Sequence, residues 1–297
     1  MGKYNNVIDL TKQNTTYVKI LKQIEPNSCV LEFGPAEGAL TRHLTQNMGC
    51  QVYIVEIDEG AYQSAIQYAA GGICGDIEQY TWETEFAEIK FDRIIFADVL
   101  EHLYHPEDVL KHVKPFLKED GKLITSLPNI AHNDILLNLY NNTFQYTETG
   151  LLDRTHIRFF AYENIEPFFE RAGFSTTEED YTTVSTFESE QKIAERNFGG
   201  FVSNSFYNRP CGEIFQFVLT LQKTEYVENN QVVRNLRIKA EMETAPQRKQ
   251  PDYYEQTKLL QQEVQNKSGH IEMLLQSERD LTAKVRERDV ALVQQAA

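Results

Sequence analysis

The stretch Cys29–Leu40, CVLEFGPAEGAL, decides the fold prediction, because it joins a short apolar run, a turn with two glycines and the start of a helix. The apolar run Cys29–Phe33 is typical of a buried strand. Gly34 and Gly38 predict a tight turn, and a helix is expected from Ala39 onward. A glycine-rich turn between a strand and a helix commonly binds phosphate through backbone N–H groups. This stretch is therefore a candidate ligand-binding turn.

The residues around the two glycines argue against a phosphate ligand. The dinucleotide fingerprint is G-x-G-x-x-G, whereas the spacing here is Gly34-x-x-x-Gly38. Pro35 removes one N–H donor, and Glu37 would place a carboxylate beside any phosphate. Glu32, on the preceding strand, adds a second carboxylate. The turn therefore favours a ligand that carries positive charge and no phosphate.

Strands and helices alternate outward from this turn. The expected strands are 29–33, 51–57, 72–74, 91–97 and 122–126, with two late strands at 174–186 and 214–223. The expected helices are 9–24, 39–47, 59–70, 106–117 and 161–172. This alternation predicts an α/β fold, in which a parallel sheet carries helices on both faces.

Acidic residues follow the next two expected strands. Glu56 ends the second strand, where a carboxylate can accept hydrogen bonds from both hydroxyls of a ribose. Asp76 follows the third strand and can accept from an adenine amino group, while the N–H of Ile77 donates to the ring. Each also has an ordinary interpretation, Glu56 as a polar strand end and Asp76 as a turn residue.

Two motifs carry a family resemblance. The spacing Glu32-x-Gly34-x-x-x-Gly38 resembles the first motif of class I S-adenosylmethionine-dependent methyltransferases. The segment Phe96–Leu103, FADVLEHL, resembles the fourth-strand motif of their ubiquinone-biosynthesis-like branch. The resemblance implies a Rossmann-like fold with a seven-stranded, mostly parallel sheet, and S-adenosylmethionine as cofactor. The cofactor-binding residues that it implies are Tyr17, Glu32, Gly34, Pro35, Gly38, Glu56, Ile57, Asp76, Ile77, Ala97, Asp98 and Val99.

A narrower resemblance appears further along the chain. The segments Leu127–His132, LPNIAH, and Gly150–Phe160, GLLDRTHIRFF, resemble bacterial methyltransferases encoded beside, or fused to, glycosyltransferases of surface-polysaccharide assembly. This implies O-methylation of a sugar or glycan, including a phosphorylated or lipid-linked one, and glycosyltransferase modules as partners. One alternative is a small-molecule acceptor that resembles a quinone precursor. Another is an inactive scaffold that acts through its C-terminal helix, against which the complete set of cofactor residues argues.

The acceptor is expected after the fourth and fifth strands, because ligands of open α/β sheets bind at the carboxyl ends of the strands. His132 is the first candidate for the catalytic base and His156 the second, since imidazole can take a hydroxyl proton near neutral pH. An arginine in this region would suit an anionic acceptor. The other acceptor candidates are His102, Asp153, Arg154 and Arg158. The alternative is that Asp153–His156 is a structural network.

No metal is expected. A metal-assisted variant that uses Glu101, His102 and His132 stays open, but their spacing matches no tight ligand motif. The four cysteines lie far apart and predict neither a zinc site nor disulfides. The aromatic-rich segment 136–146 is predicted either as a mobile lid over the acceptor or as ordinary packing.

The sequence also predicts three regions: a methyltransferase domain at 1–224, a linker at 225–252 and a coiled-coil helix at 253–297. In the last region, seven of ten heptad a and d positions are apolar, which predicts a homo-oligomer. The pattern continues to Ala297 without a cap, so we expect a longer natural protein.

Charge and hydropathy restrict the partners. The net charge is −15, and the acidic surplus lies in residues 1–228, which argues against direct binding of nucleic acid. No apolar run approaches the roughly 20 residues of a membrane span. We expect a cytoplasmic protein. Peripheral association with the inner membrane, beside polysaccharide machinery, is compatible with this expectation.

Overall fold

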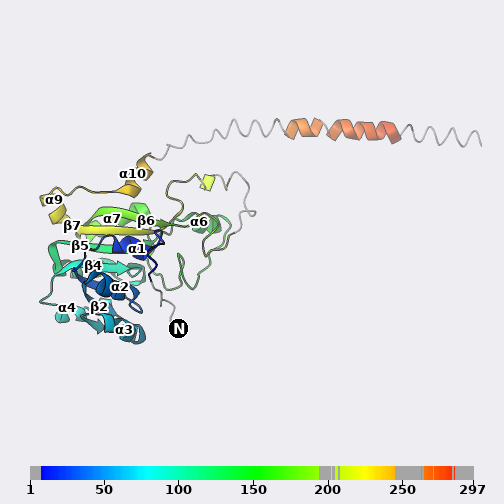
Figure 1. Cartoon of the computed structure of the whole chain (residues 1–297). Coiled ribbons are helices and arrows are strands. Elements are labelled where there is room, and N and C mark those ends of the chain that lie inside the picture. The colour runs from blue at the N-terminus through cyan, green and yellow to red at the C-terminus, as the bar shows by residue number, and fades with distance from the viewer. Residues whose placement is uncertain are drawn as a thin grey trace, which may run out of the picture. The chain divides into compact units, whose positions relative to one another are not determined.

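Seven strands form one sheet in the order β3-β2-β1-β4-β5-β7-β6 (Figure 1). Strands β1 to β5 pair in parallel, and β7 runs antiparallel to both β5 and β6. The strands are β1 (Cys29–Phe33), β2 (Gln51–Glu56), β3 (Gly71–Cys74), β4 (Phe91–Ala97), β5 (Leu117–Pro128), β6 (Phe174–Thr183) and β7 (Ile214–Lys223). The predicted fold class is confirmed.

This computed structural model describes residues 8–193, 202, 205, 206 and 208–244, and in the C-terminal part residues 262, 264–269, 271–282 and 284. The chain divides into two units, Met1–Glu243 and Thr244–Ala297. None of the helices described is long and apolar enough to cross a membrane.

Helices cover both faces of the sheet. The α-helices of the first unit are α1 (Thr16–Leu21), α2 (Ala39–Met48), α3 (Glu59–Ala65), α4 (Thr81–Glu85), α5 (Pro106–Val113), α6 (Asn133–Tyr140), α7 (Tyr162–Arg171), α9 (Thr224–Asn229) and α10 (Arg237–Thr244). Four short 3-10 helices are η1 (Ile66–Tyr68), η2 (Ile77–Gln79), η3 (Leu100–His102) and η4 (Lys114–Phe116).

Alternate residues of the central strands enter two separate hydrophobic cores, because successive side chains of a strand point to opposite faces. In β4, Ile94 and Phe96 join the core that α5 and α7 cover. Ile95, between them, joins the core that α1, α2 and α3 cover. All three side chains are fully buried, which explains why the strand reads as a continuous apolar run.

The first helix is shorter than the predicted span 9–24. The side chain of Asp9 accepts hydrogen bonds from the N–H and the hydroxyl of Thr11, at 3.0 and 2.6 Å. Such local side-chain bonds compete with helix formation, so α1 begins only at Thr16.

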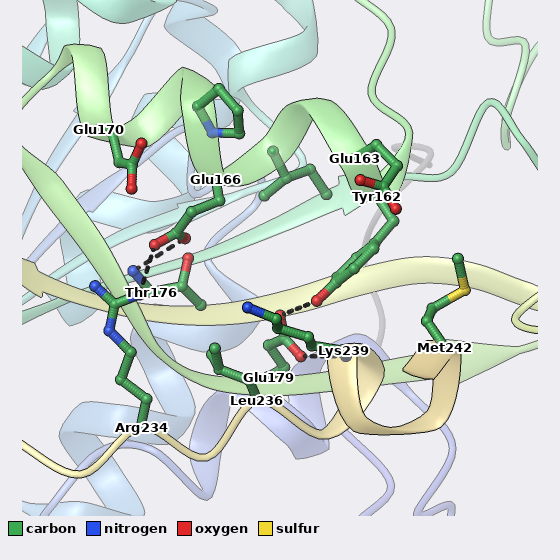
Figure 2. Close-up of a pocket in the computed structure, with 12 residues that line it drawn as sticks. Tyr162, Glu163, Glu166, Glu170, Thr176, Glu179, Arg234, Leu236, Lys239 and Met242 are labelled. Atoms are coloured by element: carbon green, nitrogen blue, oxygen red, sulfur yellow. Dashed lines mark hydrogen bonds and ion pairs between the residues drawn. The ribbon is translucent and has the colours of Figure 1, made fainter. Parts of the chain in front are cut away.

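The predicted linker at 225–252 is wrong for its first twenty residues, which fold onto α7 and β6 (Figure 2). Glu179 of β6 accepts from the Tyr162 hydroxyl at 2.8 Å and from the Ile238 N–H at 2.8 Å. Arg234 donates to Glu166 at 2.9 Å, and Ile238 is fully buried. These contacts surround a cavity of about 430 Å³ at the edge of the sheet. The segment is mostly polar, so the few residues that anchor it, such as Arg234 and Ile238, do not form a recognisable sequence pattern.

The aromatic-rich segment 136–146 divides into two parts. Its first part belongs to α6, where Leu137 is fully buried. Tyr140 at the end of α6, and Phe144 and Tyr146 beyond it, are each about half exposed or more. Packing therefore accounts for the first part only, and the lid stays a prediction.

In the second unit, the residues described are helical (Figure 1). Their apolar heptad positions Val264, Ile271, Leu274 and Leu281 are 56–63% exposed. Other heptad positions, including Leu260 and Leu292, lie outside the described residues.

Candidate active site

The turn after β1 requires glycine at two positions. Gly34 and Gly38 have φ values of +64° and +79°, a left-handed conformation that costs other residues energy. A Cβ on Gly34 would lie 2.8 Å from Cγ2 of Val99, and one on Gly38 would lie 2.8 Å from the Cα of Ala65. The turn is therefore enclosed between the end of β4 and α3, at the carboxyl edge of the sheet.

Glu56 connects this turn to the second and third strands. Its Oε2 accepts from the N–H of Ala36 at 2.9 Å, and its Oε1 accepts from the N–H of Asp58 at 3.0 Å. The carbonyl oxygen of Glu56 accepts from the N–H of Gly75 at 2.8 Å. The predicted ribose acceptor thus also organises the edge of the sheet on which a ligand would lie.

Glu32 is a buried carboxyl group that faces α2. It is 2% exposed, and its Oε2 accepts from the hydroxyl of Thr41 at 2.7 Å. The pKa of Glu32 is raised to about 7, chiefly by burial and also by the nearby charge of Glu56, while the Thr41 hydrogen bond acts in the opposite direction. Among the described residues no positive charge offsets the burial of Glu32, and a bound cation would supply one.

Asp98 follows β4 in a left-handed conformation, with φ of +56°. Its N–H donates to Oγ of Ser126 at 2.9 Å, and its Oδ1 accepts from that hydroxyl at 2.6 Å. Gln216 of β7 donates to the same oxygen at 2.8 Å and also bonds to Thr16. These bonds bring the start of α1, and with it Tyr17, close to the end of β4.

The remaining predicted cofactor residues also lie at this edge. Asp76 accepts from the N–H of Glu78 at 2.9 Å, and Ile77 is buried in the core beside it. The side chain of Ile57, directly after β2, is 69% exposed and offers an apolar surface. Because β1, β2, β3 and β4 are neighbours, their ends form one continuous rim around the glycine turn.

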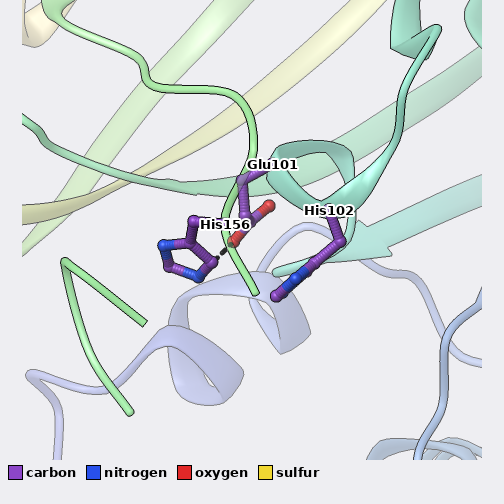
Figure 3. Close-up of side chains that lie close together, drawn as sticks. All are labelled: Glu101, His102 and His156. Carbon is purple, nitrogen blue, oxygen red and sulfur yellow. Dashed lines mark ion pairs between the residues drawn. The ribbon is translucent and has the colours of Figure 1, made fainter. Parts of the chain in front are cut away.

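Glu101, His102 and His156 lie close together (Figure 3). One ligand atom from each of the three lies within 4.8 Å of the others, and Nε2 of His156 is 3.9 Å from Oε1 of Glu101. The backbone carbonyl of Glu101 accepts from the N–H groups of Ile157 and Arg158, at 2.9 and 3.0 Å. These two bonds hold the segment of His156 against η3.

Both histidines present an Nε2 lone pair. Nδ1–H of His156 donates to the carbonyl of Leu151, and Nδ1–H of His102 donates to the carbonyl of Thr155, each at 3.2 Å. These bonds fix the tautomers, so each Nε2 is an acceptor. Burial lowers the pKa of His156, and His102 lowers it further. The imidazole of His156 is therefore neutral at pH 7.

One carboxyl oxygen of Glu101, Oε2, lacks a hydrogen-bond partner. The residue is 1% exposed, and its Oε2 makes no hydrogen bond. Burial raises its pKa well above the ordinary value, and the charge of Asp98 adds to the effect. A buried carboxyl oxygen without a partner is costly and calls for a proton or a cation.

The structure does not support His132 as the catalytic base. The residue is fully buried at the start of α6, where its Nδ1 accepts from the N–H of Asp134 at 3.2 Å. Its Nε2–H then donates to the carbonyl of Val184 at 2.9 Å. Both ring nitrogens are committed to the backbone, so neither can take a proton from an acceptor.

The predicted acceptor residues near His156 divide by exposure. Asp153 is buried, and its Oδ1 accepts from the N–H and hydroxyl of Thr155 at 2.9 and 2.6 Å, which is the structural role considered for this segment. Arg154 is exposed and pairs with Glu148 at 2.5 Å. Arg158 is exposed and donates to the carbonyl of Tyr104 at 2.5 Å.

The sequence did not indicate several residues that hold the site. Ser126 and Gln216 hold Asp98, and Thr41 holds Glu32. These partners come from distant strands and helices, and polar residues at element ends are too common for any of them to be a signal.

The order of this sheet, the glycine turn after β1 and the acidic residues at the ends of β1 and β2 define a class I S-adenosylmethionine-dependent methyltransferase. A methyltransferase-domain family matches residues 10–179, more than half of the sequence. The chain belongs to this family, and it is a methyltransferase with S-adenosylmethionine as its cofactor.

Solved structures resemble this chain at low identity. A magnesium protoporphyrin IX methyltransferase from Synechocystis PCC 6803, with bound SAH, is 19% identical over 75% of this chain and 90% of its own, with a TM-score of 0.48. A SAM-dependent methyltransferase from Archaeoglobus fulgidus is 16% identical over 72% of this chain and 97% of its own, with a TM-score of 0.50. None of the curated proteins compared with this chain matches it.

Proposed function

We propose that this methyltransferase acts on a hydroxyl oxygen of a sugar or glycan. The observation that carries the proposal is the surface around the segment Gly150–Phe160, which combines exposed aromatic rings with arginines and carboxylates. A sugar presents both apolar C–H faces and hydroxyls, so it needs walls of both kinds. A quinone-like ring would favour a closed apolar pocket.

A cavity of about 480 Å³ beside this segment has such walls. Tyr104 and Phe159 contribute rings that are 66% and 37% exposed, and Arg158 and Glu163 contribute opposite charges. Arg158 suits an anionic acceptor, such as a sugar phosphate or a sugar acid. The exposed rings of Tyr140, Phe144 and Tyr146 precede Thr147, which pairs with Asp153 in the same region.

Different predicted cofactor residues would bind different parts of S-adenosylmethionine. Glu32 and the Ala97 carbonyl would bind its cationic amino acid end, and Glu56 and Asp76 would bind ribose and adenine. S-adenosylmethionine supplies a methyl group on a sulfonium, which is already a good leaving group. The chain must therefore hold the acceptor in line and promote the loss of its proton. In this proposal the Nε2 lone pairs of His156 and His102 promote that loss.

Transfer of labelled methyl from S-adenosylmethionine to a panel of nucleotide sugars, glycans and quinone precursors tests this function. We expect label on a sugar oxygen, and a loss of about 100-fold or more in kcat for His156→Gln. His112→Gln is the matched control, because His112 lies on α5 and pairs with Glu83. Label on quinone precursors alone would contradict the sugar acceptor.

The C-terminal helix and the partners belong to the same proposal. The exposed apolar positions of the helix favour self-association, and a chain that modifies glycans would work beside glycosyltransferases, in the cytoplasm or at the inner membrane surface.

A further inference from the structure

We propose that Glu101, His102 and His156 form a binding site for a divalent first-row transition metal ion, which holds the acceptor oxygen. The inference rests on the proposed function for the role of the ion, but the site itself rests on geometry. The sequence led us to expect no metal, and the proposed site replaces that expectation. The metal-assisted alternative considered there used Glu101, His102 and His132, and in the proposed site His156 takes the place of His132.

The donor set is that of a catalytic metal site. Two imidazoles and one carboxylate, the number found in catalytic zinc sites, leave further coordination positions for water or substrate. Among the residues that the structure describes, this is the one group of three histidine, cysteine or acidic side chains with metal-ligand proximity. Imidazole donors favour zinc over magnesium and calcium, and cobalt can replace zinc as a spectroscopic probe.

The hydrogen bonds around the cluster orient the atoms that would bind the metal. Each histidine donates its Nδ1–H to a backbone carbonyl, the arrangement that commonly orients a metal-bound imidazole. The Oε2 of Glu101 is buried and has no hydrogen-bond partner, which leaves a polar oxygen unsatisfied inside the protein. A cation at the cluster would remove this cost.

The place of the cluster suits a role in transfer. Glu101 and His102 lie three and four residues after Asp98, at the end of the strand that carries the predicted cofactor carbonyl of Ala97. A metal-bound acceptor hydroxyl loses its proton more readily, and that proton leaves to solvent. The acceptor oxygen then forms the O–C bond with its lone pair, while the C–S bond breaks and its electron pair remains on sulfur.

Titration of the chelator-treated full chain with CoCl₂ tests the site by visible absorption. We expect saturation at one cobalt per chain, competition by Zn²⁺ and no competition by millimolar Mg²⁺. Glu101→Gln, His102→Gln and His156→Gln should each weaken cobalt binding at least about 100-fold. His112→Gln should leave it unchanged. Binding of S-adenosylmethionine, measured on every variant, confirms that the variants are folded.

The outcomes separate the metal site from the methyl transfer. If the wild type does not bind cobalt while it still binds S-adenosylmethionine, or if Glu101→Gln binds cobalt as tightly as the wild type, the site is refuted. Transfer that proceeds at full rate in the chelated enzyme refutes the role of the ion. Cobalt binding without label on any acceptor would instead count against the proposed sugar acceptor.

Discussion

Glu32 is the residue in which structure and cofactor chemistry are most closely coupled. It is buried and has one hydroxyl donor, and its pKa of about 7 lies above the ordinary value of a carboxyl. Below pH 7 the neutral form is therefore favoured in the folded protein until a cation binds. An S-adenosylmethionine ammonium would lower this pKa, so binding near pH 6 should release protons.

The raised pKa makes the stability of the ligand-free protein depend on pH. Because the folded pKa lies above the unfolded value of 4.5, the contribution of Glu32 is fully present below pH 4.5 and is lost as pH rises through 7. Between pH 5.5 and 8.5, the free energy of unfolding of the wild type should fall by about 2 kcal/mol relative to Glu32→Gln. Urea denaturation of both proteins measures this difference, and parallel pH curves would contradict the assignment.

Among single residues, sequence spacing is enough to bring the cofactor candidates to one edge of the sheet, but it does not distinguish between the acceptor candidates. Glu32 and Glu56 follow from spacing, because strand ends in a parallel sheet meet at one edge. His132 and His156 both follow the fifth strand, and their difference arises from bonds to distant carbonyls. His132 donates to Val184, and His156 donates to Leu151. Sequence patterns do not encode such ring orientations.

At the scale of elements, the turn between β1 and α2 fixes the cofactor rim. Gly34→Ala should destabilise the protein by about 2–3 kcal/mol, because φ of +64° is strained for alanine and the new methyl meets Val99. Binding of S-adenosylmethionine should weaken at least about 10-fold, because Val99 walls the predicted pocket. Thermal unfolding and calorimetry measure both effects.

Gly60→Ala is the matched control for this turn. Gly60 lies in α3, where its added methyl would meet only the side-chain oxygen of Asp58, at 3.3 Å. Alanine in a helix should leave stability unchanged or raise it by up to about 1 kcal/mol. If Gly34→Ala behaved like this control, the close packing of the turn against Val99 would be disproved.

Element boundaries show where the sequence was sufficient. The apolar runs predicted β1, β4 and β7 with their observed bounds, because strands buried on both faces read as continuous apolar stretches. The sequence did not predict helix α6. The residue that caps its N-terminus is His132, whose buried ring accepts a hydrogen bond from the N–H of Asp134. A histidine before an apolar segment is no recognisable start signal.

For the whole molecule, the first unit ends near residue 243 and not at 224. A fragment of residues 1–224 loses buried Ile238 and leaves Glu179 without its backbone donors. It should be less stable than residues 1–244 by more than about 3 kcal/mol in chemical denaturation. Equal stability of the two fragments would show that residues 225–244 act as a linker, as the sequence predicted.

The second unit should control self-association. Its exposed positions Val264, Ile271, Leu274 and Leu281 follow the heptad pattern, so the full chain should be an oligomer of two to four copies. Light scattering of the full chain and of residues 1–244 measures both masses. A monomeric full chain at high concentration would refute the oligomer.

Titration of the full chain with S-adenosylmethionine in a calorimeter tests most directly the claim that these strand ends form a working cofactor site. One ligand should bind per chain, with a dissociation constant in the micromolar range and with proton release near pH 6. The absence of binding at millimolar S-adenosylmethionine would contradict the account.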